Sequence, residues 1–175
     1  QWKALPPYLG ASSTVHDRLQ LWVKLGVFHK LWKEALRCYD QKCNIDWIWQ
    51  AMDGCHIVAP LGGKDTGPSY KHRCKRGSNR SLLTDKNGIP LAIVLAPANV
   101  NDFKLAKMTF ESLAIERPDP NILEQHICLD KGYDYPKIDL MVMKLKYIPH
   151  IRRRGEDAVP DEMKTHKPKR WVVER

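Results

Sequence analysis

Two aspartates, Asp53 and Asp130, stand where a carboxylate is unusual, inside or directly after an apolar run. Asp53 lies within the run 47–58, and Asp130 follows the short run 127–129. An ionised carboxylate in such surroundings is costly unless it is paired or holds a metal. Carboxylate oxygens are the ligands that Mg²⁺ and Mn²⁺ prefer. Two such acids, far apart in the sequence, therefore indicate one shared site for a divalent cation.

A plainer interpretation of Asp130 stays open. It precedes Gly132, so it could serve only as a turn or capping residue. However, an acid at the carboxyl end of a buried strand stands where open α/β sheets place their functional groups. Asp134, followed by Tyr135 and Pro136, suits the N-cap of the next helix.

The elements that must position these acids follow from apolar periodicity and turn residues. Asp85-Lys86-Asn87-Gly88 between two apolar runs predicts a tight hairpin, so the first three strands should form an antiparallel meander. The predicted order is three strands, helix, strand, helix, strand and the opening of a last helix. This is the order of the α/β (α+β) ribonuclease-H-like fold, which has a mixed sheet. The predicted strands are 47–58, 80–84, 89–95, 125–129 and 147–151. The predicted helices are 102–116, with Asp102 as its N-cap, and 136–146.

The amino-terminal part has a different character, which predicts a domain of residues 1–44 before the domain of residues 45–175. Apolar residues at helical spacing predict two helices within 12–37, separated by Gly26. Two helices around a glycine turn, with basic residues, are compatible with a DNA-binding helix-turn-helix. A plain helical hairpin with a solvated charged face fits the same pattern.

The formal net charge of +9 and pI of about 9.4 favour a polyanionic partner, nucleic acid above all. A membrane is disfavoured, because the apolar run 89–98 is interrupted by Pro90 and Pro97 and is too short to span one. Residues 60–79 form a glycine-rich basic loop that suits DNA-backbone contact, although a merely solvated loop has the same composition. Its candidate DNA-binding residues, with one just past it, are Lys71, Arg73, Lys75, Arg76 and Arg80.

The five cysteines argue for a reducing compartment, because their number is odd and no Cys-x-x-Cys pair occurs. A histidine stands beside or near a cysteine at 55–56, 72–74 and 126–128. None of these pairs has the usual spacing of zinc ligands, so we expect no structural zinc.

Several stretches carry a family resemblance over nearly the whole chain. They read STVHDRLQLWVKLGVF, DGCHIVAPLGG, GPSYKHRCKRGSNRSLLTDKNGIPLAIVLAPANVND, LDKGYD and KRWVVER. The chain resembles the DDE transposases of bacterial insertion sequences, in the IS-four/IS-five group. The resemblance implies a ribonuclease-H-like domain whose catalytic, metal-holding acids are Asp53, Asp130 and Glu174.

The last motif of this group reads Tyr, two residues, Arg, three residues, Glu, six residues, Lys. Arg170 and Glu174 match that spacing, whereas Lys167 stands in place of the tyrosine. The final lysine would lie beyond Arg175, and the first residue is not methionine. We therefore expect a fragment of a longer protein, cut within the helix that carries the third acid.

The implied reaction is metal-dependent cleavage at an element end, which frees a 3′-hydroxyl that then attacks target DNA. The implied cofactor is Mg²⁺ or Mn²⁺, and Arg170 would bind phosphate. The implied partners are element-end and target DNA and further copies of the protein, as a homodimer or higher oligomer, with no membrane. The expected location is the bacterial cytoplasm, at the nucleoid. Two alternatives stay open: another ribonuclease-H-like nuclease that cuts without joining, and an inactive or domesticated DNA-binding protein.

Overall fold

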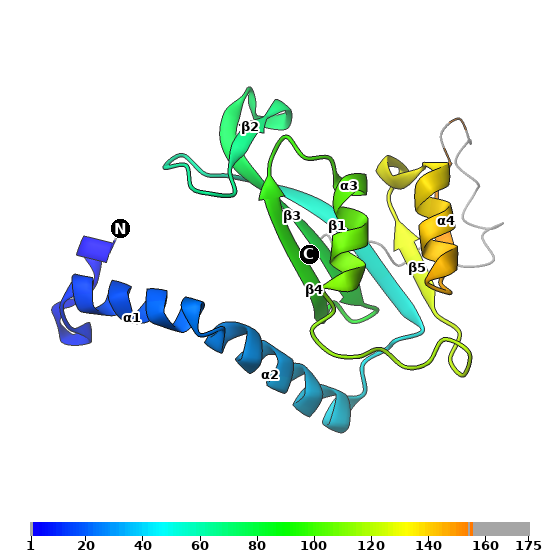
Figure 1. Cartoon of the computed structure of the whole chain (residues 1–175), viewed down its shortest axis with the longest axis horizontal. Helices are drawn as coiled ribbons and strands as arrows, with labels where there is room; N and C mark the ends of the chain where they lie inside the picture. The colour runs from blue at the N-terminus through cyan, green and yellow to red at the C-terminus, as the bar shows by residue number, and fades with distance from the viewer. Residues whose placement is uncertain (1, 154, 156–175) are drawn as a thin grey trace. The chain divides into compact units, whose positions relative to one another are not determined.

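The computed structural model describes residues 2–153 and 155 (Figure 1). The chain divides into two compact units, Gln1–Cys43 and Asn44–Arg175. Both candidate acids that the structure describes, Asp53 and Asp130, belong to the second unit. The second unit also contains all of the sheet.

The first unit is helical. Two 3-10 turns, η1 (Trp2–Ala4) and η2 (Pro7–Leu9), precede α1 (Ser12–Lys24) and α2 (Val27–Cys43). Gly26 lies between the two helices at φ +66°, a conformation that favours glycine. The helices follow one another end to end in Figure 1, an arrangement more open than the helical hairpin that was one of the two alternatives from the sequence. Leu36 is the only buried residue of α1 and α2, so their apolar side chains remain largely exposed.

Within its described residues, the second unit is built on one mixed sheet of six strands. Its strands are β1 (Trp49–Val58), β2 (Gly67–Ser69), β3 (Lys75–Asp85), β4 (Pro90–Pro97), β5 (His126–Leu129) and β6 (Ile148–Ile151). Its helical elements are α3 (Asp102–Glu111), α4 (Pro136–Lys144), and the single turns η3 (Tyr70–His72) and η4 (Lys131–Tyr133).

The strand order confirms the predicted ribonuclease-H-like topology. β1 pairs antiparallel with β3 and parallel with β5, and β5 pairs parallel with β6. β4 pairs antiparallel with β3 through the hairpin turn predicted at 85–88. The short strand β2, which the sequence did not predict, also pairs with β3. The parallel pairing places Leu129, the last residue of β5, beside Met52 in the middle of β1.

Helices α3 and α4 lie on the same side of the sheet in Figure 1. Ser81 of β3 faces α3, because the hydroxyl of Thr109 donates a hydrogen bond of 2.8 Å to the Ser81 hydroxyl. Gly54 is the register partner of Ser81, so it faces α3 too. Side chains alternate along a strand. Asp53 therefore points to the opposite face of the sheet.

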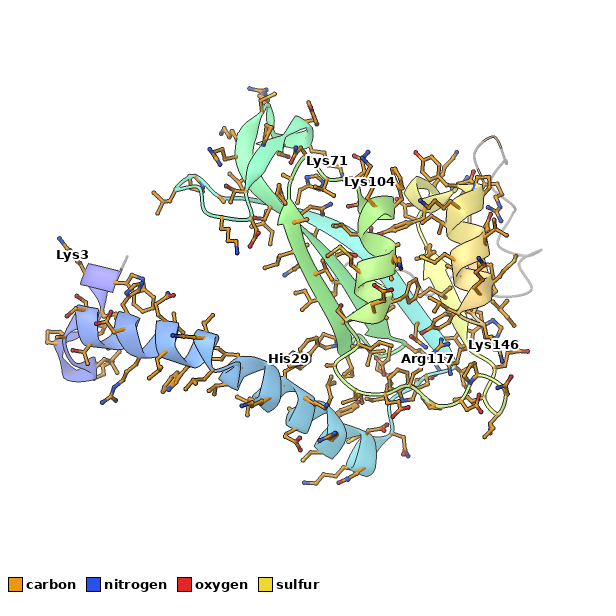
Figure 2. All side chains as sticks on the ribbon, in the orientation of Figure 1. Lys3, His29, Lys71, Lys104, Arg117 and Lys146 are labelled. Carbon is orange, nitrogen blue, oxygen red and sulfur yellow. The ribbon has the colours of Figure 1, made fainter. Side chains whose placement is uncertain are left out.

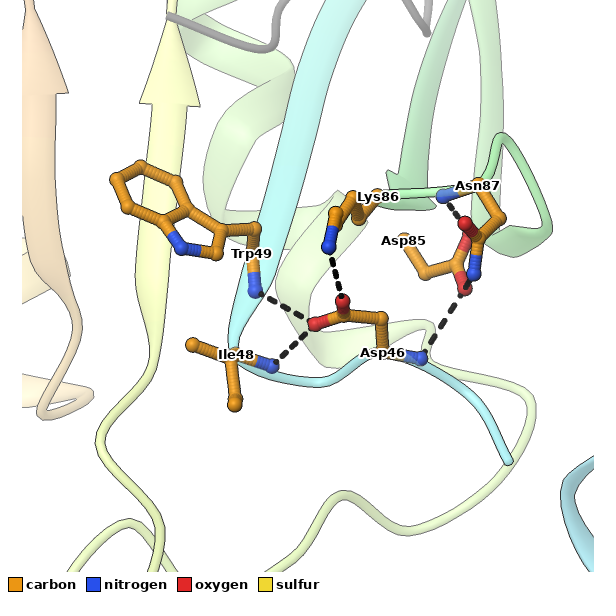
Figure 3. A network of polar contacts seen from close by, with 6 residues as sticks. All are labelled: Asp46, Ile48, Trp49, Asp85, Lys86 and Asn87. Carbon is orange, nitrogen blue, oxygen red and sulfur yellow. Dashed lines mark hydrogen bonds and ion pairs between the residues drawn. The ribbon is translucent and has the colours of Figure 1, made fainter. Parts of the chain in front are cut away.

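A buried carboxylate holds the hairpin turn and the segment that leads into β1 (Figure 3). Asp85 accepts hydrogen bonds of 2.8 Å from the amides of Asn87 and Ile89, and one of 3.2 Å from the amide of Asp46. Asp46 in turn accepts from the amide of Ile48 and pairs with Lys86, at 3.1 and 3.3 Å. The start of β1 is thereby fixed against the β3–β4 turn.

Two predicted boundaries and two predicted caps are wrong. Strand β3 begins at Lys75 rather than at residue 80, because glycine at position 77 allows close pairing with β1: a Cβ there would lie 2.5 Å from the Ile57 carbonyl oxygen. Helix α3 ends at Glu111 instead of near 116. The N-caps of α3 and α4 are Asn101 and Tyr135. The aspartates expected there, Asp102 and Asp134, bind the side chains of Asn79 and Arg153 instead.

Candidate active site

The two aspartates reach the same level of the sheet. Met52 of β1 and Leu129 of β5 form the last register pair of the parallel strands, and Asp53 and Asp130 are the next residue on each chain segment. Both side chains are half-buried, and the backbone of Asp130 is still extended at φ −71° and ψ 161°. The fold therefore brings together two acids that are distant in the sequence.

Each carboxylate is oriented by the backbone amide that follows it. Asp53 Oδ1 accepts a hydrogen bond of 2.7 Å from the amide of Gly54, and Asp130 Oδ1 accepts one of 2.6 Å from the amide of Lys131. Asp130 also caps η4, so the turn role weighed for it is real. A carboxylate has about four lone-pair sites, so each side chain can accept further donors or a cation.

Tyr133 lies in the negative electrostatic field of this region. The side chain is 1% exposed and lies in η4, three residues after Asp130. Burial raises the pKa of its phenol far above the ordinary value, and the charges of Asp102, Asp53 and Asp130 raise it further, while the Ser81 hydroxyl lowers it. The phenol thus stays neutral beside three carboxylates whose negative charge a cation would offset.

Asp102 is a third acid beside these two, and sequence reasoning assigned it only a capping role. Its Oδ1 accepts a hydrogen bond of 2.6 Å from the buried amide of Asn79 on β3. Its carboxylate lies directly against the backbone of β1, because a Cβ on Gly54 would lie 2.0 Å from Asp102 Oδ1. The sequence held one signal of this contact: a glycine beside Asp53 in the middle of a strand, which often marks a close approach.

The predicted DNA-binding residues that the structure describes lie on or beside β3. Lys71, Arg73 and Lys75 are exposed, whereas Arg76 donates hydrogen bonds to the Thr66 hydroxyl. Arg80 is half-buried. It lies on the same face as Asp53, because it stands two positions from Leu82, the register partner of Asp53. Arg80 Nε is buried and has no hydrogen-bond partner within the part of the chain that the structure describes.

The remaining predicted site residues, Glu174 and Arg170, lie outside the described residues, as does Lys167. Among residues 2–153 and 155, no group of three or more histidine, cysteine, aspartate or glutamate side chains could hold a metal ion. Of the three residues predicted as ligands, the structure describes Asp53 and Asp130. In the same part of the chain, no helix combines the length and apolarity needed to cross a membrane.

The sheet order and the paired acids at its parallel strands define a ribonuclease-H-like domain. Residues 50–175 match the family described as Transposase DDE domain, and the chain belongs to that family. It is also 30% identical over 122 residues to the "Putative transposase for insertion sequence element IS402" of Burkholderia cepacia. That match covers 65% of the chain and 54% of the relative, so the chain spans about half the length of the curated relative.

Two solved transposase structures have a low similarity to the chain. The catalytic domain of the Mos1 mariner transposase has 12% identity and a TM-score of 0.40, over 69% of this chain and 57% of that one. The piggyBac transposase in a synaptic complex with hairpin DNA has 10% identity and a TM-score of 0.42, over 69% and 26%.

Proposed function

We propose that the protein carrying this domain is a transposase that cuts DNA at the ends of an insertion sequence and joins the freed strand to target DNA. The observation that carries the proposal is the common level of Asp53, within β1, and Asp130, directly after the adjacent parallel strand β5. The family of the chain and its IS402 relative support the same activity.

The residues present fit a divalent cation. Asp53 and Asp130 offer hard carboxylate oxygens, and after burial, the main cause, the charges of Asp102, Asp53 and Asp130 further raise the pKa of Tyr133. We propose Mg²⁺ or Mn²⁺ as the resident ion and Glu174 as the third ligand. When bound, such ions polarise the scissile phosphate and stabilise the attacking and leaving oxygens of an in-line displacement.

The chain's own residues would orient the substrate. The amides of Gly54 and Lys131 fix the two carboxylates before any ion binds, so little reorganisation is needed at the moment of reaction. Arg80, half-buried on the face of Asp53, would contact a DNA phosphate through its guanidinium, and Arg170 would hold another. Backbone phosphates farther along the duplex would contact Lys71, Arg73, Lys75 and Arg76.

The functional oligomer would be a homodimer or larger assembly that holds two element ends together, working at the bacterial nucleoid. The helical unit, residues 1–44, would add DNA affinity. Its two helices carry basic residues, and their exposed apolar side chains leave a surface for DNA or for another copy.

The test is cleavage and strand transfer by the natural protein that carries this sequence, on DNA with the ends of its own element. Asp53→Asn should abolish Mg²⁺-dependent cleavage and leave DNA affinity within about twofold. Glu116→Gln, which neutralises an exposed acid away from the site, should cut normally. Cleavage by Asp53→Asn at the wild-type rate would show that Asp53 is not a ligand.

The reaction products distinguish the proposed transposase from the two alternative functions. Joined strands support a transposase, whereas cleavage without joining supports a different ribonuclease-H-like nuclease. Binding without metal-dependent cleavage of either strand supports a DNA-binding protein that has lost or never had catalysis.

A further inference from the structure

Arg153, two residues after the last residue of β6, connects three elements of the second unit through one guanidinium group. Its Nη1 donates hydrogen bonds of 2.9 Å to Asp134 Oδ1 and 2.8 Å to Asp139 Oδ2, and its Nη2 donates one of 3.2 Å to Asp139 Oδ1. Asp134 is the C-cap of the turn η4, and Asp139 lies in the first turn of α4. Arg153 therefore holds the segment after β5 against the end of β6 and the start of α4.

The geometry of this cluster is that of a strong ion pair. Arg153 binds Asp139 through two hydrogen bonds, one from each Nη, which is the arrangement in which arginine and a carboxylate interact most favourably. The side chains of Asp134 and Asp139 are only 18% and 19% exposed. Exposed ion pairs contribute little to stability, but bidentate geometry and a shared cation are the recognised exceptions. Both aspartates bind the same nitrogen, so their negative charges are close together and Arg153 offsets their repulsion.

The turn η4 links this cluster to the second candidate acid, because Asp130 is the N-cap of the same turn. The amide of Tyr133 donates a hydrogen bond of 2.9 Å to the Asp130 carbonyl oxygen, and the amide of Lys131 donates one of 2.6 Å to the Asp130 carboxylate. A single 3-10 turn has poorer hydrogen-bond geometry than an α-helix, so its course depends on contacts outside it. The buried ring of Tyr133 holds its middle, and Arg153 holds its end through Asp134.

We propose that Arg153 is a positioning residue for the metal site. By holding Asp134, it keeps η4 in the course that directs the Asp130 carboxylate toward the metal ion. The proposal rests on the proposed function, because the ion belongs to that site. Removal of residues that orient metal ligands weakens metal binding by about 10–100-fold. Because Arg153 acts through a further residue, the effect of its loss should fall at the lower end of that range.

Hydrogen exchange tests this role in the natural protein that carries this sequence, with neither metal nor DNA present. In Arg153→Gln, the amides of Lys131 and Tyr133 should exchange about tenfold faster, because η4 opens locally when its end is released. Arg153→Lys keeps the charge and loses the bidentate geometry, so it should restore part of the protection. Unchanged exchange at both amides in Arg153→Gln would overturn the proposal.

Lys146→Gln is the matched control, because it also removes a cation that donates a hydrogen bond, one of 2.6 Å to Asn121 Oδ1. Figure 2 shows Lys146 beyond the last turn of α4, at the opposite end of the helix from η4. This control should leave the exchange of both η4 amides at the wild-type rate. Asp134→Asn, which weakens the contact from the other side, should have the effect of Arg153→Gln.

A titration with Mn²⁺ alone, followed by electron paramagnetic resonance, measures the affinity of the metal site in the same proteins. Arg153→Gln should bind Mn²⁺ about tenfold more weakly than wild type, and Arg153→Lys should lose less affinity. Asp139→Asn in the Arg153→Gln background should recover part of the affinity, because it removes one of the two carboxylates that Arg153 held together. In cleavage assays, kcat of Arg153→Gln should fall at low Mg²⁺ and recover at high Mg²⁺, while KM for DNA stays within about twofold.

The possible outcomes distinguish this proposal from the proposed function. Mn²⁺ binding that Asp53→Asn abolishes but Arg153→Gln leaves unchanged would refute the positioning role alone. Absence of Mn²⁺ binding by the wild-type protein would refute the metal site as well. A loss of metal-free DNA affinity as large as the loss of Mn²⁺ affinity would make Arg153 a DNA contact rather than a positioning residue. Weaker Mn²⁺ binding with unchanged metal-free DNA affinity, together with faster exchange in η4, supports the proposal.

Discussion

Gly54 and Asp102 are in direct contact across the interface between β1 and α3: a Cβ at position 54 would lie 2.0 Å from Oδ1 and 2.3 Å from Cγ of Asp102. The absence of a side chain next to Asp53 is therefore what lets the Asp102 carboxylate reach Asn79. This contact couples the strand that carries the first acid to the start of α3.

Gly54→Ala should displace Asp102 and break its 2.6 Å hydrogen bond to Asn79. Overpacking of this kind costs about 1–3 kcal/mol of unfolding free energy, which urea denaturation would measure. Gly132→Ala is the matched control, because its added Cβ meets no heavy atom within 4 Å. Equal stability of the two variants would contradict the packing seen at Gly54.

Mg²⁺ should raise the melting temperature of the chain, because an ion that binds only the folded site stabilises it by mass action. The rise should disappear in Asp53→Asn and persist in Glu116→Gln. Without metal, Asp53→Asn should be as stable as wild type or slightly more stable, since it removes one of several neighbouring negative charges. Differential scanning fluorimetry at several Mg²⁺ concentrations tests both statements. A Mg²⁺ effect of equal size in Asp53→Asn would locate the ion elsewhere.

Tyr133 should make the fold sensitive to alkali. Its pKa in the folded chain is raised above the ordinary value of 10.0 by burial and by nearby carboxylates, so the unfolded chain releases the phenol proton first. This contribution to stability is complete below about pH 10 and is lost above it, by up to about 1.4 kcal/mol per pH unit. Burial raises the pKa of Tyr147 as well, so Tyr133→Phe should remove only part of the slope.

Urea denaturation between pH 8 and pH 11 measures that slope. Tyr70→Phe is the control, because the Tyr70 ring is exposed in the folded chain and its substitution should leave the slope unchanged. A Tyr133→Phe variant with the wild-type slope would show that the Tyr133 phenol ionises as readily in the folded chain as in the unfolded one.

DNA binding should weaken steeply with salt, because basic side chains release counterions from the backbone. Arg73→Gln and Lys75→Gln, which change exposed residues at the start of β3, should each reduce the slope of log affinity against log salt by about 1. Lys144→Gln at the end of α4 should leave the slope unchanged. Fluorescence anisotropy titrations at salt concentrations from about 50 to about 200 mM measure these slopes. An unchanged slope in both β3 variants would exclude this segment from the interface.

The sequence was sufficient to predict five of the six described strands and the neighbouring positions of Asp53 and Asp130, because those signals are local. Apolar runs marked β1 and β5, and Asn87-Gly88 marked the turn between β3 and β4. The environment of Asp102 depends on a long-range bond to Asn79, which no local pattern encodes. The start of β3 was missed for a similar reason, since pairing with β1 outweighs the turn preference of Gly77.

The pairing of β1 with β5 also determines at which stage of protein synthesis Asp53 and Asp130 can come together. Asp53 is made early and Asp130 much later, and a whole hairpin and α3 separate them along the chain. During synthesis, a growing polypeptide therefore carries its basic β3 segment well before the two acids can meet. In the proposed transposase, the segment for DNA contact would thus be made before the acid pair needed for cleavage.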